Sequence, residues 1–389
     1  MQGPTHQACA PAEWIRTLRD EALSSQRSTR SVLAKQVHSP SQKQVQELIV
    51  VANALPLRMR VREASEPSNG ANSRYAFEWD DGSLLVQARP AAASARSVVY
   101  VGSLPQEVTP EEYAAVEADL RSGFNCVPVF LGEELQHNFY RRFCKATLWP
   151  IMHYVLPLQL NGAGRFSTSL WNAYLDANRL YAQRVAEVLN PRLDYVWVHD
   201  YHLMLLPSFL RHRFLHARIG FFMHSPFPSS EIFRSFPQRE TFLRGLLNVD
   251  LIGFHTFDYA RHFLSCCTRV LGLRYESARG ALSVDYYGRT VGVKICPTGV
   301  QPQRLQSCFS RSETLNRRTE LSNALQGTTV LLGIDDTDMF KGIMLKLQAF
   351  QSMLDTHPEW RGKVVLVQIA NPARAGGREI EGLTDEVHR

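Results

Sequence analysis

The chain has 389 residues, of which 44% are hydrophobic and 21% are charged. This composition is typical of a soluble globular protein and excludes a largely disordered chain, a collagen and a coiled coil. No apolar run reaches ~18 residues and the N-terminus lacks an apolar signal core, so we expect neither a membrane span nor a secretory signal. The formal net charge of +6 is mild, and without a basic-aromatic stripe it favours a small anionic ligand over nucleic acid.

Seven cysteines are scattered between Cys9 and Cys308, and none of them forms a CxxC pair. This spacing gives no support for a zinc site or a redox motif. Free thiols indicate a reducing compartment, so we expect a cytoplasmic protein that uses neither a metal nor another cofactor.

The predicted elements begin after a polar segment. Residues 1–45 are rich in Ser, Gln and Arg, and we interpret them as a flexible tail. Within this tail, residues 24–31 are either a plain solvated segment or a phosphorylation site. Short runs rich in Val, Ile and Phe then predict strands at 48–51, 98–101, 126–130, 195–198, 219–223, 251–254, 330–334 and 364–369. Helical periodicity predicts helices at 169–189, 257–270 and 341–354. Strands that are apolar on both faces and alternate with helices are typical of a doubly wound α/β fold with a parallel sheet.

The C-terminal part differs from the rest. Tyr286-Tyr287-Gly288 predicts a hairpin late in a first domain at 46–310, which a linker and helix at 311–327 follow. The strand–helix–strand unit expected at 328–389 cannot cover both faces of a parallel sheet. We therefore expect it either to be the start of a longer domain or to pack against the first domain.

Polar residues follow several predicted strands, where ligands bind in open α/β sheets. Three successive strands end in histidine, at His199, His224 and His255, and Asp200 follows the first of them. A metal site is one interpretation, but no carboxylate cluster accompanies the histidines. We favour hydrogen bonding to a polyhydroxylated ligand, because neutral imidazole donates and accepts as a sugar hydroxyl does.

Four further residues are candidates on weaker grounds. Gly82 lies in a turn and Lys341 precedes a glycine at a predicted helix start, where phosphate can bind. An ordinary turn explains each of them equally well. Tyr140 and Trp149 are aromatic side chains with polar groups, and core packing is the alternative for both.

Four segments resemble motifs of the trehalose-6-phosphate synthase family, glycosyltransferase family 20. They are Leu148-Trp149-Pro150, VWVHDYHL at 196–203, GFFMHSPFP at 220–228 and GFHTFDYAR at 253–261. The resemblance covers about residues 46–389 and is closest to the plant class II branch. It implies a GT-B architecture of two Rossmann-like domains with a cleft between them, the first complete at 46–310 and the second truncated within 328–389.

The resemblance also implies an activity and its residues. The family transfers glucose from UDP-glucose to glucose 6-phosphate with retention and without a metal, in trehalose biosynthesis. The implied acceptor residues are Tyr140, Trp149, Asp200 and Arg374, of which Arg374 pairs with the acceptor phosphate. The implied donor residues are Gly82, His224 and Lys341. Asp200 and His224 are the implied catalytic residues.

Three positions depart from the family pattern. Ala54 stands where active members have an arginine, Ser83 replaces the second glycine of a Gly-Gly-Leu loop, and Asp336 stands in place of a pyrophosphate-binding arginine. A cation ~4 Å from a phosphate contributes up to ~4 kcal/mol at an effective dielectric constant of about 20. Because the leaving UDP needs positive charge in the transition state, these departures predict a weak or inactive enzyme.

The sequence leaves more than one function open. The first is a UDP-forming α,α-trehalose-phosphate synthase homologue with weak or no activity. The alternative is a non-catalytic regulatory sugar-phosphate-binding or scaffold protein of trehalose metabolism, and a third is a working synthase with an altered donor. The expected ligands are a sugar phosphate and UDP-glucose, with neither nucleic acid nor a membrane. A protein partner or self-association through the incomplete C-terminal unit is a further expectation.

Overall fold

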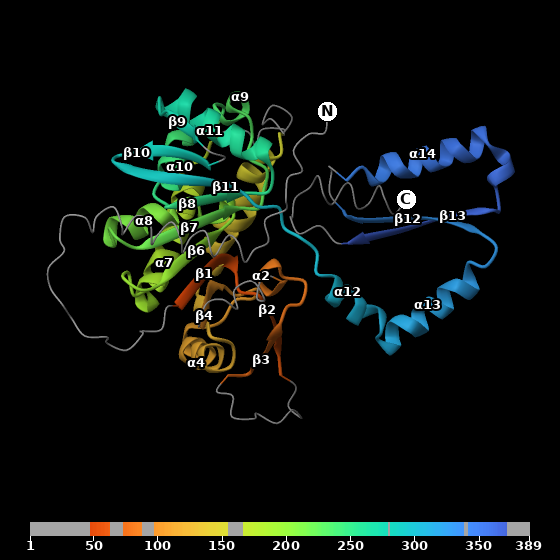
Figure 1. The fold of residues 1–389 in the computed structure, drawn as a ribbon. Coiled ribbons are helices and arrows are strands. Elements are labelled where there is room, and N and C mark those ends of the chain that lie inside the picture. The colour runs from red at the N-terminus through yellow and green to blue at the C-terminus, as the bar shows by residue number, and fades with distance from the viewer. Residues whose placement is uncertain are drawn as a thin grey trace. The chain divides into compact units, whose positions relative to one another are not determined.

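The computed structural model describes residues 47–62, 73–87, 97–154, 166–278, 281–337 and 341–371. The tail expected at 1–45 and the expected acceptor residue Arg374 lie outside these ranges. The chain divides into two compact units between Gly299 and Val300 (Figure 1). We call them unit 1 and unit 2 and describe each by itself.

Unit 1 is built on a nine-stranded sheet. In sheet order its strands are β5 (Cys126–Val129), β4 (Ser97–Ser103), β1 (Glu47–Ala54), β6 (Tyr195–His199), β7 (Arg218–Met223), β8 (Leu251–Phe254), β11 (Arg289–Ile295), β10 (Ala281–Tyr286) and β9 (Tyr275–Ala278). The pairs from β5 to β11 are parallel, whereas β10 is antiparallel to both β11 and β9. The order reverses at β1, which lies between β4 and β6, and ligands bind at such switch points in open α/β sheets.

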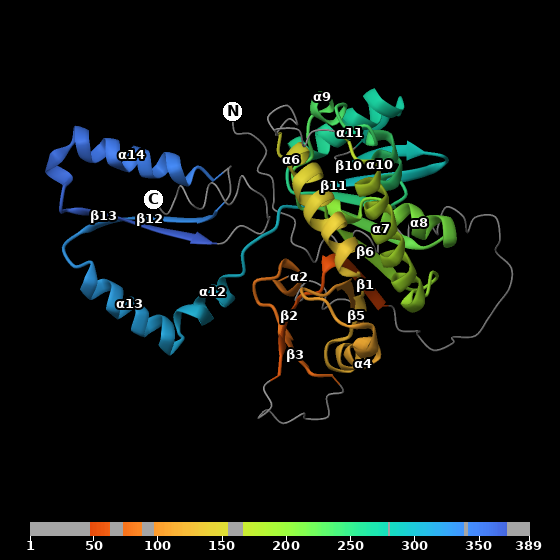
Figure 2. The same cartoon turned by 180° about the vertical axis from the view of Figure 1, so that it is seen from behind.

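Helices cover the sheet because its strands are apolar on both faces. The helical elements of unit 1 are α2 (Leu84–Gln87), η1 (Pro110–Glu112), α4 (Tyr113–Phe124), α5 (Glu133–Gln136), η2 (His137–Leu148), α6 (Trp149–Met152), α7 (Thr168–Val188), η4 (Tyr201–Leu203), α8 (Leu206–Arg213), α9 (Ser230–Phe233), α10 (Arg239–Leu246) and α11 (Phe257–Leu271). One hydrophobic cluster joins the sheet to η2, α7, α8, α10 and α11, and Figure 2 shows α7 lying across this face. A second cluster joins the opposite face to α4 and to the hairpin of β2 (Leu57–Val61) and β3 (Tyr75–Trp79).

Local sequence sets several boundaries in unit 1. Helix α7 begins after Ser167, whose hydroxyl accepts the backbone N–H of Leu170, and α11 begins after Thr256, which caps it in the same way. Helix α11 ends at Gly272, which has a φ of 70°, a conformation that glycine adopts without steric cost. The hairpin between β10 and β11 turns at Tyr287 and Gly288, both of which have positive φ.

Unit 2 is small and sparsely buried. It contains α12 (Pro302–Phe309), α13 (Ser312–Ala324), β12 (Thr329–Asp336), α14 (Ile343–Thr356), η5 (Pro358–Trp360) and β13 (Val364–Asn371). Strands β12 and β13 form a two-stranded parallel sheet. In the described part of unit 2, only Gly333, Thr337 and Ile343 are buried.

These findings confirm the expected α/β class with a large parallel sheet, and each of the eight expected strands is present. The hairpin at Tyr286-Tyr287-Gly288 is also present. In the described part of the chain, no helix combines the length and apolarity that crossing a membrane requires.

Candidate functional site

Three histidines lie side by side at the carboxyl edge of neighbouring strands, as their positions predicted. Nδ1 of His199, the last residue of β6, lies 2.9 Å from Nε2 of His224, which follows β7. The ring centroids of His224 and His255, which follows β8, are 5.4 Å apart. The parallel order β6–β7–β8 brings together residues that are up to 56 positions apart in the chain.

Asp200 holds a turn between the first two strands of this row. Its backbone has a φ of 66° and a ψ of 170°, which strains any residue other than glycine. Its Oδ1 accepts the backbone N–H groups of His224 at 3.1 Å and Ser225 at 2.9 Å, and its Oδ2 lies 3.3 Å from the Ser225 hydroxyl. The carboxylate therefore joins the segments that follow β6 and β7.

Side chains of helix α7 hydrogen-bond to the backbone that follows Asp200. The hydroxyl of Tyr174 donates to the carbonyl of Tyr201 at 2.8 Å and accepts the backbone N–H of Met204 at 3.0 Å. The amide of Asn178 donates to the carbonyl of His202 at 3.1 Å. Tyr174 and Asn178 are one helical turn apart and fully buried, so they supply partners for the backbone of a buried turn that would otherwise lack them.

The protonation states in this cluster follow from burial and from neighbouring charge. Burial lowers the pKa of His202 and of His224 to about 4, although the nearby Asp200 carboxylate partly opposes this. Burial alone would raise the pKa of Asp200, but His202, His224 and backbone N–H donors lower it overall. At neutral pH the site is therefore an ionised carboxylate among neutral imidazoles, a set of groups suited to hydroxyl ligands.

Tyr140 lies against this cluster, on the helical segment η2. This segment is a π-helix, a rare conformation that is frequent at functional sites. The ring of Tyr140 stacks on His202 with centroids 5.7 Å apart, and Nζ of Lys145 lies 5.5 Å from the centroid of the Tyr140 ring. The charge of Lys145 is one of the smaller contributions that lower the pKa of His202. A cation and an aromatic ring therefore flank the carboxylate side of the site.

Trp149 begins α6, directly after η2. Its ring stacks on His153 with centroids 4.1 Å apart, and Nδ1 of His153 lies 2.8 Å from the carbonyl oxygen of Trp149. Both Trp149 and Tyr140 are half-buried and pack against the main hydrophobic cluster. Core packing is thus part of the role of each residue.

The Gly82 turn follows β3 and is exposed. Its backbone N–H donates to Oδ1 of Asp80 at 3.0 Å, and Asp80 also accepts Nε of Arg58 at 3.1 Å. Ser83 accepts the backbone N–H of Leu85 at the start of α2, a single-turn helix. The backbone N–H groups of Gly82, Ser83 and Leu85 therefore already have partners within the turn.

Ala54 is exposed at the end of β1, the strand at the switch point. Gly102 of β4 lies so close to this end of β1 that a Cβ added to it would be 2.6 Å from the backbone N of Leu55. The end of β1 can pack this closely against β4, its parallel neighbour, only because residue 102 has no side chain. The position at which the sequence resemblance implies an arginine therefore lies beside this close backbone contact and carries a methyl group.

Lys341 and Asp336 belong to unit 2. Lys341 is exposed and precedes Gly342, whose φ is 65°. The neighbouring Asp335 pairs with Nζ of Lys346 and accepts Nε2 of Gln368 at 2.9 Å. Asp336 pairs in register with Asn371 at the carboxyl end of the two-stranded sheet, so a negative charge occupies this strand end.

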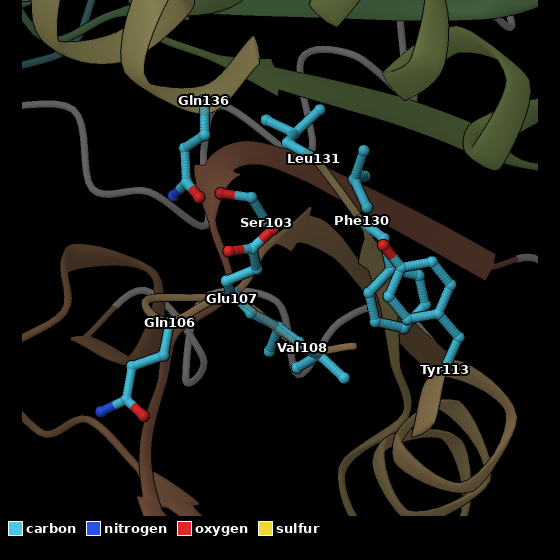
Figure 3. Close-up of a pocket in the computed structure, with 10 residues that line it drawn as sticks. Ser103, Gln106, Glu107, Val108, Tyr113, Phe130, Leu131 and Gln136 are labelled. Carbon is cyan, nitrogen blue, oxygen red and sulfur yellow. The ribbon is translucent and has the colours of Figure 1, made fainter. Parts of the chain in front are cut away.

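A separate pocket lies beyond the carboxyl ends of β4 and β5 (Figure 3). The stacked rings of Tyr113 and Phe130, with centroids 3.8 Å apart, form one wall. Oε1 of Glu107 accepts the backbone N–H of Glu133 at 3.1 Å. The pocket has a volume of about 10 Å³, which is room for about one water molecule and too small for a sugar.

The site contains residues to which the sequence had given no role: Tyr174, Asn178 and Lys145. The sequence does contain a sign of the role of Tyr174 and Asn178. The two residues lie one turn apart on the apolar face of a helix, and a buried amide there needs hydrogen-bond partners. Among the described residues, no group of three or more His, Cys, Asp or Glu side chains is placed to hold a metal ion.

The chain matches a known protein family over most of its length. Residues 46–389 match glycosyltransferase family 20. The chain is 51% identical to a probable α,α-trehalose-phosphate synthase [UDP-forming] 7 of Arabidopsis thaliana and 51% identical to α,α-trehalose-phosphate synthase [UDP-forming] 6 of the same plant. These alignments cover 90% and 88% of this chain, but only 40% and 41% of the relatives' lengths.

Two solved structures have a similar fold. An α,α-trehalose-phosphate synthase (UDP-forming) from Burkholderia vietnamiensis has a TM-score of 0.71 and 29% identity, over 90% of this chain and 69% of that one. The N-terminal domain of a Candida albicans trehalose-6-phosphate phosphatase has a TM-score of 0.72 and 30% identity, over the same shares of the two chains. The fold is therefore the GT-B glycosyltransferase type, of which this chain spans about two thirds.

Proposed function

The chain belongs to glycosyltransferase family 20, and from this membership we propose that it binds glucose 6-phosphate in unit 1 as the acceptor of a trehalose-phosphate synthase reaction. The donor in this proposal is UDP-glucose, from which glucose passes to the acceptor with retention and release of UDP. Residues 46–310 are the acceptor-side domain, and 328–389 begin the nucleotide-sugar domain.

One observation carries the proposal: the carboxylate of Asp200 accepts the backbone N–H of His224 and lies 3.9 Å from Nδ1 of His202, the ring on which Tyr140 stacks. Asp200 accepts hydrogen bonds from sugar hydroxyls. It is a binding group rather than a general base, because a carboxylate with a lowered pKa is a poor proton acceptor at neutral pH. Neutral His224 hydrogen-bonds the transferred glucose.

The acceptor phosphate requires cations. Lys145 supplies one beside Tyr140, and we assign Arg374 as a second, on its match to the family pattern. Trp149 contributes an apolar ring against the sugar. Charged hydrogen bonds of this kind contribute ~1.5–3 kcal/mol each, so Arg374→Ala should weaken binding of glucose 6-phosphate by tenfold or more.

On the donor side, Gly82 and Lys341 contact the nucleotide sugar, but this side is depleted of positive charge. Ala54 and Asp336 replace cations, and the backbone N–H of Gly82 already donates to Asp80. We therefore propose that glucose transfer by this chain is weak or absent.

The same depletion favours a second candidate, a sugar-phosphate-binding protein of trehalose metabolism without turnover. The two candidates differ in one measurement. UDP release on incubation with UDP-glucose and glucose 6-phosphate supports catalysis, whereas saturable binding of glucose 6-phosphate without UDP release supports the binding protein.

Calorimetric titration with glucose 6-phosphate tests the shared binding site. Asp200→Asn removes the charge but keeps an oxygen for the backbone N–H groups of His224 and Ser225, and should weaken binding by about tenfold or more. Asp176→Asn is the matched control, because Asp176 is an exposed carboxylate on α7 that pairs with Arg179. Equal affinity of the two variants would refute the proposed site.

A further inference from the structure

His255 makes a hydrogen bond in which the donor is certain. The backbone N–H of Thr298 donates to Nδ1 of His255, with the two nitrogens 3.2 Å apart. A backbone N–H can only donate, so Nδ1 must accept and carries no proton. The hydroxyl of Thr298 lies 3.5 Å from the same nitrogen and, because Nδ1 is bare, can only donate to it as well.

The end of the sheet explains why a side chain accepts this N–H group. Where β11 pairs with β8, the backbone N–H of Cys296 donates to the carbonyl of Phe254 at 2.8 Å. The pairing stops there, because Thr256 is the N-cap of α11 and its carbonyl accepts an N–H group of that helix. Nδ1 of His255 accepts the next N–H group of the departing strand instead, which gives Thr298 a partner.

The proton of the neutral His255 ring is then on its other nitrogen. Burial lowers the pKa of His255 below its ordinary value, although the Asp200 carboxylate partly opposes this, so the ring is neutral at pH 7. A neutral imidazole has one N–H group, which lies at Nε2 when Nδ1 is bare. Nε2 of His199 and Nε2 of His202 are buried without a partner, whereas Nε2 of the half-buried His255 is not buried in this way. Within the described part of the chain, His255 therefore has an unpaired and accessible N–H group.

His255 lies beside the groups proposed to bind the sugar. Its ring centroid is 5.4 Å from that of His224 and 5.0 Å from that of Phe222, against which it packs edge-on at 79°. The Asp200 carboxylate is close enough to act on its pKa. A carboxylate only accepts hydrogen bonds, so it binds the proton of a sugar hydroxyl and leaves the oxygen lone pairs to other groups. The N–H group of His255 is a donor of the kind that such an oxygen requires.

We propose that Thr298 fixes His255 as the Nε2–H tautomer, and that His255 is a further binding residue that donates from Nε2 to a hydroxyl oxygen of the sugar bound by Asp200. The identity of this sugar, glucose 6-phosphate, rests on the proposed function, whereas the tautomer of His255 does not. Asp200 and His255 together satisfy both the donor and the acceptor capacity of sugar hydroxyls, which favours a polyhydroxylated ligand.

Nitrogen-15 NMR of the full chain, labelled at histidine, tests the tautomer without a ligand. At pH 7, two-bond correlations should show Nε2 of His255 protonated and Nδ1 bare, with the assignment taken from the spectrum of H255Q. A protonated Nδ1 on His255 would overturn the proposal, whether or not any sugar binds.

Two variants separate the two hydrogen bonds of His255. In H255N the amide oxygen lies near the position of Nδ1 and accepts the N–H of Thr298, but no group reaches the position of Nε2. In H255Q the amide reaches the position of Nε2 and donates to the ligand, but the contact with Thr298 is lost. The amide hydrogen of Thr298 should therefore exchange more slowly in H255N than in H255Q. Equal exchange in the two variants would overturn the role of Thr298.

Calorimetric titration with glucose 6-phosphate tests the role in binding. H255N should bind about three- to tenfold more weakly than H255Q, the loss expected for one neutral hydrogen bond. A purely structural role of His255 predicts the opposite order, because H255N keeps the contact with Thr298. H216N is the matched control and should bind as the unmodified chain does, because His216 is exposed and precedes β7, at the other edge of the sheet.

The possible outcomes distinguish this proposal from the proposed function. Equal affinities of H255N and H255Q for glucose 6-phosphate, or a difference confined to UDP-glucose, would overturn the binding role of His255 while the proposed function stands. If glucose 6-phosphate does not bind the unmodified chain, the proposed function fails and the binding role fails with it. The NMR spectrum of the unmodified chain still decides the tautomer in that case.

Discussion

The carboxylate of Asp200 accepts the backbone N–H of Ser225 at 2.9 Å and lies 3.3 Å from the Ser225 hydroxyl. This contact joins the segments that follow β6 and β7, and it holds Asp200 in a backbone conformation with positive φ. The residue proposed to bind the sugar is therefore also a structural support of the site.

Asp200→Ala should destabilise the protein because it leaves the backbone N–H groups of His224 and Ser225 unpaired. The expected loss in the free energy of unfolding is about 1–3 kcal/mol, measured by urea denaturation. Ser225→Ala removes only the longer contact and should cost less than about 1 kcal/mol. Equal losses for the two variants would contradict this account of the turn.

Gly102→Ala should be strongly destabilising. Its Cβ would lie 2.6 Å from the backbone N of Leu55 and 2.7 Å from the backbone carbon of Ala54, and backbone atoms cannot move aside cheaply. We expect a loss of about 1–3 kcal/mol, as for other overpacked positions. Gly123→Ala is the control, since nothing lies within 4 Å of an added Cβ in helix α4 and alanine should stabilise the helix by roughly 0.5–1 kcal/mol. A neutral Gly102→Ala would contradict the close approach of β1 and β4.

Stability should fall as the pH drops from about 6.5 to about 4. His202 and His224 have a pKa of about 4 in the folded protein but near 6.5 when unfolded. Between these values the unfolded state binds more protons, so the free energy of unfolding decreases with decreasing pH, by up to ~1.4 kcal/mol per pH unit for each histidine. Denaturation of His224→Gln between pH 4 and 7 should show a shallower slope. An unchanged slope would contradict the buried, neutral state of His224.

Lys145→Met should weaken binding of glucose 6-phosphate about three- to tenfold without changing the binding of glucose. The reason is that Lys145 places a cation beside Tyr140 and near His202, where only the phosphate of the ligand responds to it. Arg141→Met, at an exposed position on the same helical segment, is the control. An equal loss for glucose and its phosphate would assign Lys145 to packing rather than to phosphate binding.

Strand β12 should exchange its amide hydrogens faster than β6. The side chains of Leu332 and Ile334 are 63% and 59% exposed, whereas Val196 and Val198 of β6 are fully buried. Weakly buried elements open at lower cost, and exposed apolar strands favour association. Hydrogen exchange of a monomeric sample measures this. Equal protection of the two strands would show that unit 2 is as stable as unit 1.

The sequence predicted the strands well because each is a short apolar run. It predicted the histidine row because three successive runs are each followed by a histidine. It did not predict the hairpin of β2 and β3, although in β2 the buried Leu57 and Met59 alternate with the exposed Arg58 and Arg60. That alternation is only five residues long. The π-helix carrying Tyr140 was missed because its period differs from the 3.6-residue pattern of an α-helix.

Features set by tertiary contacts could not be predicted from the sequence. The positive φ of Asp200 depends on hydrogen bonds from a segment 24 residues away, and no local pattern encodes it. The contact between His199 and His224 depends on the pairing of β6 with β7, in which His199 lies opposite Phe222. In the sequence, Gly102 is an ordinary glycine within a predicted strand. Its close approach to Leu55 is apparent only in the folded structure.

The most direct test of the account compares two dissociation constants for the same chain. Calorimetry should give tighter binding for glucose 6-phosphate than for UDP-glucose, because the proposed acceptor side contains Asp200, Tyr140 and Lys145, whereas Ala54 and Asp336 stand where the family resemblance implies cations on the proposed donor side. Tighter binding of UDP-glucose, or no binding of glucose 6-phosphate, would contradict the central claim.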